Sequence, residues 1–225
     1  MNYYAVIVAG GTGNRMSNSI PKQFLLLNGL PVMMHAIDVF YKSHQRPEIV
    51  VVLSQELHEY WFDLCKTHEF TVPHSLANAG LQRFHSVKNG LTQIKGDGIV
   101  AVHDAARPLV ADSVVRHSYE VALEKGNCVV GVSPVDSVRT SYPDRTTTAL
   151  DRTHLKLVQT PQTFQVNELK KAYELEYKAE FTDDASVMEA YGVSINIIEG
   201  NRENIKITYP EDLDIASVLI RKKRP

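Results

Sequence analysis

The sequence predicts one α/β domain in which a doubly wound, mostly parallel sheet is covered by helices on both faces. Two observations predict this fold class. Short apolar runs rich in β-branched residues recur along the chain, and the stretches between them carry apolar residues at helical spacing. Because strands and helices alternate in this way over roughly the first 130 residues, right-handed βαβ crossovers are expected.

Apolar runs of this length, bounded by turn residues, are typical of buried strands. The expected strands are residues 4–9, 49–53, 99–103, 128–132 and 193–198. The expected helices that lie between the first strands are residues 32–41, 56–68, 84–94 and 113–124. Together these elements form a single domain over residues 1–225.

The pattern changes after Val132, where residues 133–152 show no sustained helical period. Alternating residues flank the turn candidate Tyr142-Pro143-Asp144, which predicts a projecting β-hairpin arm. A two-stranded ribbon is marginal in water when it stands alone, so the arm is expected to hold a partner and the protein to be a homodimer.

Three further helices complete the expected fold. Two lie near residues 167–177 and 183–191, and the last begins at about Pro210. Thr208 and Glu211 have capping-box spacing, and Pro210 falls in the first turn, where proline is tolerated. Lys206 is expected in a short apolar strand just before this helix.

The composition excludes several classes of protein. Of the 225 residues, 44% are apolar and 22% are charged, which excludes a disordered or fibrous chain. The net charge of −2 argues against a nucleic-acid or membrane surface. Cys65 and Cys128 show no CxxC spacing, and no apolar stretch approaches the roughly 18 residues of a membrane span. We therefore expect a soluble, cytoplasmic protein that binds neither nucleic acid nor membrane.

A glycine-rich loop follows the first expected strand. Residues 9–16 read AGGTGNRM and contain Gly10, Gly11 and Gly13. Glycines let the backbone approach a ligand and expose N–H groups to an anion, although a tight turn explains them too. The loop is neither a dinucleotide fingerprint nor a Walker A motif. Arg15 and Lys22 are cations that could hold a triphosphate beside it.

The strand at residues 99–103 leads into His103-Asp104-Ala105-Ala106-Arg107-Pro108. Ligands of open α/β sheets bind outside the carboxyl ends of the strands, where Asp104 and Arg107 fall. A carboxylate there can hold Mg²⁺ against phosphate oxygens, and local capping or pairing is the alternative. Neither HExxH nor GxSxG is present, so zinc-protease and α/β-hydrolase chemistry are not indicated.

The segment from Gly80 to Ser86 precedes an expected helix. Ser86 and nearby backbone groups could face a base or a ribose, or they could form only the N-terminal cap region of that helix. For Asp183 and Asp184, only capping of the following helix is expected.

In chain order, the motifs AGGTGNRM, PKQF, RFHSVKNGL, VHDAARP, VQTPQTF, TDDASV, NIKIT and PEDL resemble those of the 2-C-methyl-D-erythritol 4-phosphate cytidylyltransferases. The resemblance covers nearly the whole chain. It implies a Rossmann-like nucleotidyltransferase fold whose β-arm interlocks a homodimer. It also implies a reaction in which CTP and Mg²⁺ are used, 4-diphosphocytidyl-2-C-methyl-D-erythritol is formed and pyrophosphate is released.

The resemblance further implies a role for individual positions. Contacts to CTP are implied for Ala9, Gly10, Gly11, Gly13, Arg15, Lys22, Gly80, Ser86 and Asp104, with Asp104 also associated with the metal. The acceptor, a sugar-alcohol phosphate, is implied to contact Arg107, Thr160 and Lys206, together with Ser137 and Arg152 from the arm of the neighbouring subunit. Catalysis is expected to depend on Arg15, Lys22, Arg152 and Lys206.

Two alternatives remain open at this point. The opening AGG is shared with ribitol-5-phosphate cytidylyltransferases, whereas Asp151-Arg152, His154 and TDDASV favour methylerythritol as the acceptor. In the turn Ala79-Gly80-Leu81, Leu81 stands at a position ahead of the arginine where the family usually has a polar residue. This departure would fit a nucleotide-binding regulator without catalysis. The arm carries Ser137, which keeps a hydroxyl where the family usually has threonine, and Arg139 in place of lysine.

Overall fold

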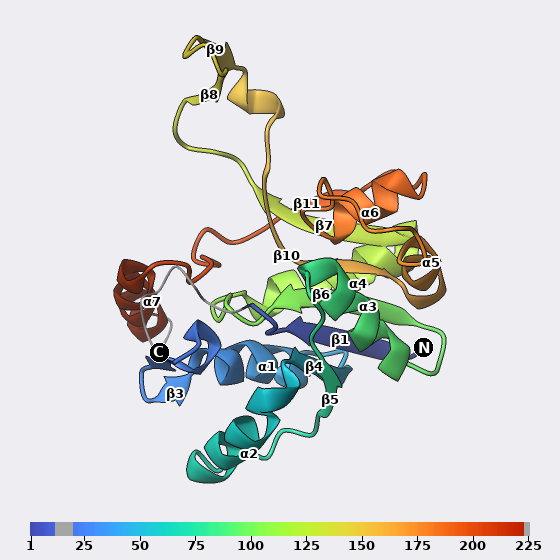
Figure 1. Cartoon of the computed structure of the whole chain (residues 1–225), viewed down its shortest axis with the longest axis vertical. Helices are drawn as coiled ribbons and strands as arrows, with labels where there is room; N and C mark the ends of the chain where they lie inside the picture. The colour runs from blue at the N-terminus through green and yellow to red at the C-terminus, as the bar shows by residue number, and fades with distance from the viewer. Residues whose placement is uncertain (12–19, 223–225) are drawn as a thin grey trace.

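A seven-stranded sheet forms the centre of the protein in a computed structural model that describes residues 1–11 and 20–222 (Figure 1). Across the sheet the strands are β11 (Ile197–Glu199), β7 (Asn127–Val132), β10 (Leu157–Gln165), β6 (Ile99–Asp104), β1 (Tyr3–Val8), β4 (Glu48–Leu53) and β5 (Ser75–Asn78). β10 is antiparallel to β6 and β7, whereas the pairs β1–β4, β1–β6, β4–β5 and β7–β11 are parallel. The predicted doubly wound, mostly parallel sheet is confirmed.

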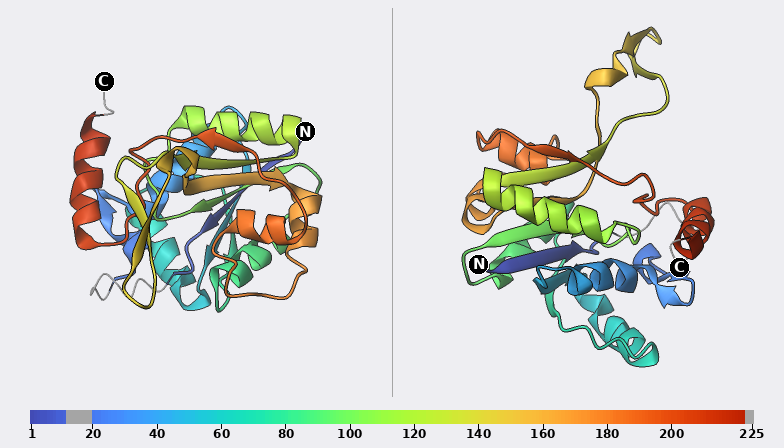
Figure 2. Two further views of the ribbon diagram at one scale, coloured as in Figure 1. Left: turned by 90° about the horizontal axis from the view of Figure 1, so that it is seen from above. Right: turned by 180° about the vertical axis from the view of Figure 1, so that it is seen from behind.

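Helices cover both faces of this sheet (Figure 2). One face carries α1 (Val32–Lys42), α2 (His58–Thr67) and α4 (Asp112–Lys125), and the other carries α3 (Arg83–Gln93), α5 (Val166–Ala172) and α6 (Asp184–Ala190). The last helix, α7 (Pro210–Lys222), packs on the small hairpin of β2 (Leu26–Leu27) and β3 (Leu30–Pro31). None of the helices in the described ranges is both long and apolar enough to cross a membrane.

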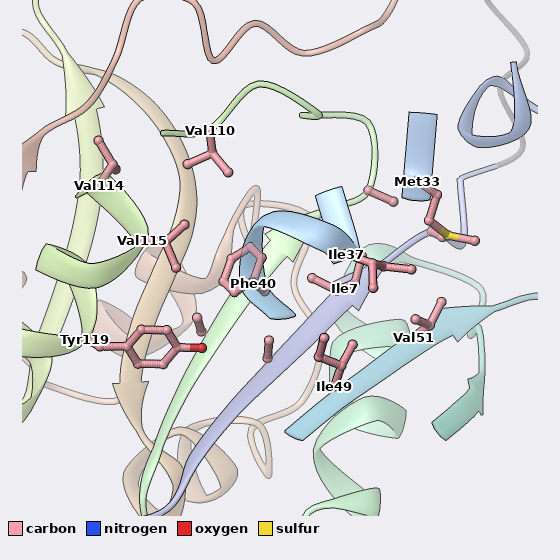
Figure 3. Packing of buried hydrophobic residues seen from close by; sticks show 14 of the residues in the cluster. Ile7, Met33, Ile37, Phe40, Ile49, Val51, Val110, Val114, Val115 and Tyr119 are labelled. Atoms are coloured by element: carbon pink, nitrogen blue, oxygen red, sulfur yellow. The ribbon is translucent and has the colours of Figure 1, made fainter. Parts of the chain in front are cut away.

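The core forms because side chains of each strand alternate between the two faces. In β1, Ala5 and Ile7 join the cluster under α1 and α4, while Tyr4 and Val6 join the cluster under α3. Figure 3 shows Ile7 packed with Ile37 and Phe40 of α1. Burial on both faces explains why the parallel strands read as continuous apolar runs in the sequence.

The segment after β7 leaves the body of the protein as the predicted arm (Figure 1). Its strands β8 (Val138–Ser141) and β9 (Thr147–Leu150) pair antiparallel, with Val138 opposite Leu150 and Ser141 opposite Thr147. The turn is closed by a hydrogen bond from the Arg145 amide to the Tyr142 carbonyl, 3.0 Å long. All four residues of β9 are exposed, so the arm adds little to the core of its own chain.

Several details differ from the sequence-based expectation. The expected strand at 193–198 is shorter, since β11 covers Ile197–Glu199, and β5 and β10 were not expected at all. The segment around Lys206 is not a strand, and it is tied to the loop after β6 by a hydrogen bond from the Ile207 amide to the Ala106 carbonyl.

The expected capping box of α7 is also wrong. The Asp212 carboxylate accepts hydrogen bonds of 2.8 Å from the amides of Thr208 and Tyr209, while the Thr208 hydroxyl donates to the Lys206 carbonyl. The helix begins at Pro210, so its third residue is Asp212, and this shorter carboxylate reaches back in place of Glu211. The expected cap by Asp183 is confirmed, because its side chain accepts from the Ser186 amide at the start of α6.

Candidate functional site

A cavity of about 480 Å³ opens at the carboxyl ends of β1 and β6. Its wall contains the end of β1, the loop after β6, the turn between β5 and α3, and η1 (Lys22–Phe24). Eight of the predicted site residues line it, namely Ala9, Gly10, Gly11, Lys22, Gly80, Ser86, Asp104 and Lys206. The fold therefore gathers segments distant in sequence at the sheet edge where α/β proteins bind ligands.

The other predicted residues lie elsewhere. Gly13 and Arg15 fall outside the described residues. Arg107 and Thr160 contact Asp104 but are not part of the cavity lining. Ser137 and Arg152 are exposed and belong to the arm and to η3 (Arg152–His154) next to it, so the fold of one chain does not bring them into the cavity.

Two glycines let the walls of the cavity approach one another. A Cβ on Gly10 would lie 2.7 Å from the Ala79 Cβ, and a Cβ on Gly80 would lie 2.3 Å from the His85 Cβ. The buried Ser86 hydroxyl accepts from the Gly80 amide at 3.0 Å and donates to the Gln82 carbonyl at 3.2 Å. Ser86 thus holds the turn that faces the cavity.

Gln23 is a buried residue of this wall that the sequence analysis missed. Its side-chain amide donates a 2.9 Å hydrogen bond to the Ala9 carbonyl, which fixes η1 to the end of β1. The neighbouring Lys22 is thereby held at the cavity beside the glycine loop.

Asp104 is a carboxylate surrounded by positively charged side chains in the cavity floor. Its carboxylate lies 2.8 Å from Lys206 Nζ, 3.3 Å from Arg83 Nε and 3.8 Å from Arg107 Nε. Burial alone would raise the pKa of Asp104, but the ion pairs with Arg83 and Lys206 outweigh it and hold the pKa well below its usual range. Arg83 also binds a second carboxylate, Asp184, so three cations face two carboxylates. The remaining positive charge attracts anions such as phosphates.

A buried hydrogen-bond chain lies behind Asp104. The Asp104 amide donates to the Thr160 hydroxyl at 3.1 Å, and this hydroxyl lies 3.0 Å from His103 Nδ1. His103 Nε2 lies 3.0 Å from the Arg107 carbonyl. Burial lowers the pKa of His103 to about 4, so the ring is neutral, accepts from Thr160 and donates to Arg107. His103 and Thr160 therefore fix the end of β6.

Arg107 secures the segment that carries Lys206. Its guanidinium donates to the backbone carbonyl of Asn204 at 2.8 Å. The buried side-chain amide of Asn204 donates in turn to the Thr160 carbonyl at 2.9 Å. The chain between residues 204 and 208 is thus held against β10 and the loop after β6 without any strand pairing. Lys206 consequently reaches Asp104 although 102 positions separate them.

The cavity fits a metal that arrives with a phosphorylated ligand better than one held by protein alone. No cluster of three or more acidic, cysteine or histidine side chains suited to a metal occurs within residues 1–11 and 20–222. Among the described residues of the cavity wall, Asp104 is the single carboxylate. Mg²⁺ usually binds through one or two carboxylates plus substrate phosphates and water, and this donor set matches that requirement.

Comparisons with known proteins agree on one family. The family model described as IspD, 2-C-methyl-D-erythritol 4-phosphate cytidylyltransferase, matches residues 3–222. A protein of that description from Phocaeicola vulgatus is 48% identical over 220 residues, which is 98% of this chain and 100% of the relative. Another from Bacteroides thetaiotaomicron is 47% identical with the same coverage.

Solved structures agree with the relatives. The Francisella tularensis 2-C-methyl-D-erythritol 4-phosphate cytidylyltransferase superposes with a TM-score of 0.80 at 29% identity, covering 97% of this chain and 99% of that one. The Thermus thermophilus enzyme of the same description gives a TM-score of 0.79 at 26% identity, covering 98% and 100%. The similarity therefore extends over nearly the whole length of the chain.

Proposed function

The chain belongs to the 2-C-methyl-D-erythritol 4-phosphate cytidylyltransferase family, and from this premise we propose how its residues carry out the reaction. The enzyme transfers the cytidylyl group of CTP to 2-C-methyl-D-erythritol 4-phosphate, a step of isoprenoid precursor biosynthesis, and pyrophosphate leaves. The observation that carries the assignment of residues is the cavity lined by Lys22, Asp104 and Lys206.

The chemistry requires no covalent enzyme intermediate. An oxygen of the acceptor phosphate attacks the α-phosphorus of CTP, and the bond to the β-phosphate breaks on the opposite side. A phosphate monoester is largely a dianion at neutral pH, so a general base is not needed. Positioning and neutralisation of charge supply most of the acceleration.

The triphosphate of CTP is proposed to lie against the glycine loop. Gly11 and Lys22 line the cavity, which supports this placement, and the backbone of Ala9 and Gly10 in the same wall is proposed to contact the base. Lys22 would neutralise charge that builds on the α-phosphate and on the leaving pyrophosphate. Arg15 is proposed to neutralise this charge as well, and Gly13 is proposed to contact the CTP phosphates as part of the glycine loop. Gly80 and Ser86, in the wall next to Gly10, are proposed to border the cytosine and the ribose.

Asp104 is proposed to hold Mg²⁺ together with phosphate oxygens of the nucleotide. The ion would neutralise part of the negative charge of the phosphates. Lys206, which lies 2.8 Å from the Asp104 carboxylate, is proposed to bind the acceptor phosphate. Arg107 and Thr160 would support this side of the acceptor pocket from behind.

The arm is proposed to complete the cavity of a second subunit in a homodimer. The exposed strand β9 and the exposed apolar side chains Val135, Leu157 and Val158 at the base of the arm favour burial against a partner. Ser137 and Arg152 would reach the methylerythritol phosphate bound by that partner, since they lie outside the cavity of their own chain.

Pyrophosphate release tests the acceptor. The purified protein is incubated with CTP, Mg²⁺ and either 2-C-methyl-D-erythritol 4-phosphate or ribitol 5-phosphate. Rapid release with the first acceptor and little with the second is expected. Equal or faster release with ribitol 5-phosphate would contradict the proposed acceptor, and no release with either would favour a regulator that only binds nucleotide.

A further inference from the structure

We propose that the fully buried Asp184 and the partly buried Arg83 form a positioning pair that fixes the Asp104 carboxylate in the cavity floor. The inference rests on the proposed role of Asp104 in holding the metal and the nucleotide. Neither Asp184 nor Arg83 was expected to act at the site from sequence, where Asp184 was interpreted only as part of a helix cap.

The geometry of the pair is bidentate. Arg83 Nη1 and Nη2 donate to the two oxygens of Asp184 at 3.0 and 2.7 Å. The Asp184 side chain is fully buried, and its Oδ1 also accepts from the Tyr173 hydroxyl at 2.5 Å. With both terminal nitrogens held in this way, the remaining Nε of Arg83 faces Asp104 Oδ1 at 3.3 Å.

The planar guanidinium transmits this orientation to Asp104. A guanidinium presents its donors in a rigid fork, so fixing Nη1 and Nη2 also fixes the direction of Nε. Arg83 then engages Oδ1 of Asp104 while Lys206 engages Oδ2. Each carboxylate oxygen has its own cation, and the plane of the carboxylate is set before any ligand binds.

Asp184 is itself anchored to the central sheet. It is the first residue of α6, and the start of this helix is held by Gln162 of β10. The side-chain amide of Gln162 donates to the Asp183 carboxylate at 2.9 Å, and its side-chain oxygen accepts from the Ala185 amide at 2.8 Å. Contacts therefore run from the sheet through Asp184 and Arg83 to Asp104.

Stability alone gives little reason for such an arrangement. A buried ion pair often contributes no more than an apolar pair of the same volume, because both charges lose their hydration. Arg83 also lines the cavity, so a pair that served packing alone would not need to lie there. Orientation of Asp104 accounts for both the position of the pair and its bidentate form.

A double-mutant cycle tests the proposal. The dissociation constant of CTP in excess Mg²⁺ is measured by calorimetry for the native protein, Asp184→Asn, Asp104→Asn and the double variant. Asp184→Asn should weaken binding by about 5-fold or more in the native background and by less than about 2-fold in the Asp104→Asn background, because coupled residues are not additive. If Asp184→Asn weakened CTP binding by the same factor in the native and the Asp104→Asn backgrounds, the proposal would be overturned.

Asp183→Asn is the matched control, because Asp183 is adjacent and lies at the same helix start, but its carboxylate accepts hydrogen bonds from Gln162 and the Ser186 amide instead of from Arg83. Asparagine is also a good N-cap, so CTP affinity should stay within about 2-fold of native. Arg83→Lys keeps the charge but loses the fork, and it should behave like Asp184→Asn; native affinity in this variant would contradict the proposal.

A second variant covers a loss of folding in Asp184→Asn, which deprives the partly buried Arg83 of its bidentate carboxylate partner. Arg83→Met combined with Asp184→Leu removes both charges and should remain folded. CTP affinity and turnover equal to native in this variant would overturn the positioning role, whereas a loss of at least about 5-fold is expected. Pyrophosphate release by the native protein shows separately that the proposed function holds.

Discussion

Lys22 is the residue whose charge the proposed chemistry needs most directly. It lies in the cavity wall beside the glycine loop, held there by the neighbouring Gln23. If it neutralises charge in the transition state, Lys22→Ala should lower kcat by about 100-fold or more.

Steady-state kinetics of pyrophosphate release measures the effect, and thermal unfolding shows that the variant is folded. Lys88→Ala, which removes an exposed lysine on α3, serves as the control and should retain native kcat. A folded Lys22→Ala enzyme with native turnover would remove Lys22 from the mechanism.

His103 makes the stability of the fold depend on pH. Burial lowers its pKa from 6.5 to about 4, so the unfolded chain binds a proton more readily than the folded one. The stability that depends on the neutral His103 ring is fully present above about pH 6.5, and it is lost as the pH falls toward about 4. Between about pH 7 and about pH 4.5, the free energy of unfolding should fall by about 2 kcal/mol through this residue.

Urea unfolding at the two pH values measures this change. The pKa of Asp104 is also lowered, but Asp104 loses its contribution to the free energy of unfolding only when the pH falls below about 3.8, its ordinary pKa. The change between about pH 7 and about pH 4.5 is therefore attributed to His103. His103→Gln, which does not titrate, should show a smaller change with pH. An equal change in this variant would show that other groups are responsible.

At the residue scale, the sequence identified the site residues that follow strands in short motifs. Lys22, Asp104 and Lys206 belong to such motifs, and the fold brings all three to one cavity. Arg83 and Asp184 could not be paired from sequence, because 101 positions separate them and each also stands where a helix begins. Only the packing of α6 beside α3 brings the two charges together.

At the scale of elements, Gly80 couples the turn before α3 to the start of that helix. A Cβ at this position would lie 2.3 Å from the His85 Cβ and 3.0 Å from the His85 carbonyl carbon, so the backbone must shift. Gly80→Ala should destabilise the fold by about 1–3 kcal/mol, the usual cost of overpacking, and should weaken CTP binding.

Chemical denaturation and CTP titration check this prediction. Gly11→Ala is the stability control, since a Cβ there meets nothing within 4 Å, and its free energy of unfolding should stay near native. A Gly80→Ala protein as stable as Gly11→Ala would show that the turn can relax without cost.

β10 is a strand that the sequence pattern missed because buried polar groups hold it. β10 contains Gln159, Thr160, Gln162 and Thr163, all buried, so it does not appear as an apolar run. Its polar side chains bind groups far away in sequence, as Thr160 does with Asp104 and Gln162 with α6. A continuous apolar run predicts a strand that meets helices on both faces, whereas a strand that binds polar partners in the core leaves no such run.

At the scale of the whole molecule, the arm separates two groups of proposed site residues. Lys22, Asp104 and Lys206 lie in the cavity, whereas Ser137 and Arg152 lie on the exposed arm and η3. The Arg152 guanidinium donates to the Val135 carbonyl at the base of the arm, so its side chain is held at the arm and not at the cavity of its own chain. A site made by two subunits is the arrangement that lets both groups act on the same substrates.

Mixing two inactive variants tests this arrangement. Lys22→Ala and Arg152→Ala should each lose most activity as pure proteins. In a mixed dimer, one site would combine the native Lys22 of one subunit with the native Arg152 of the other, and the second site would carry both changes. Unfolding and refolding a 1:1 mixture makes half of the dimers mixed, so pyrophosphate release should recover to about a quarter of native. If each chain used its own arm, every site would keep one defect and the mixture would stay as inactive as its components.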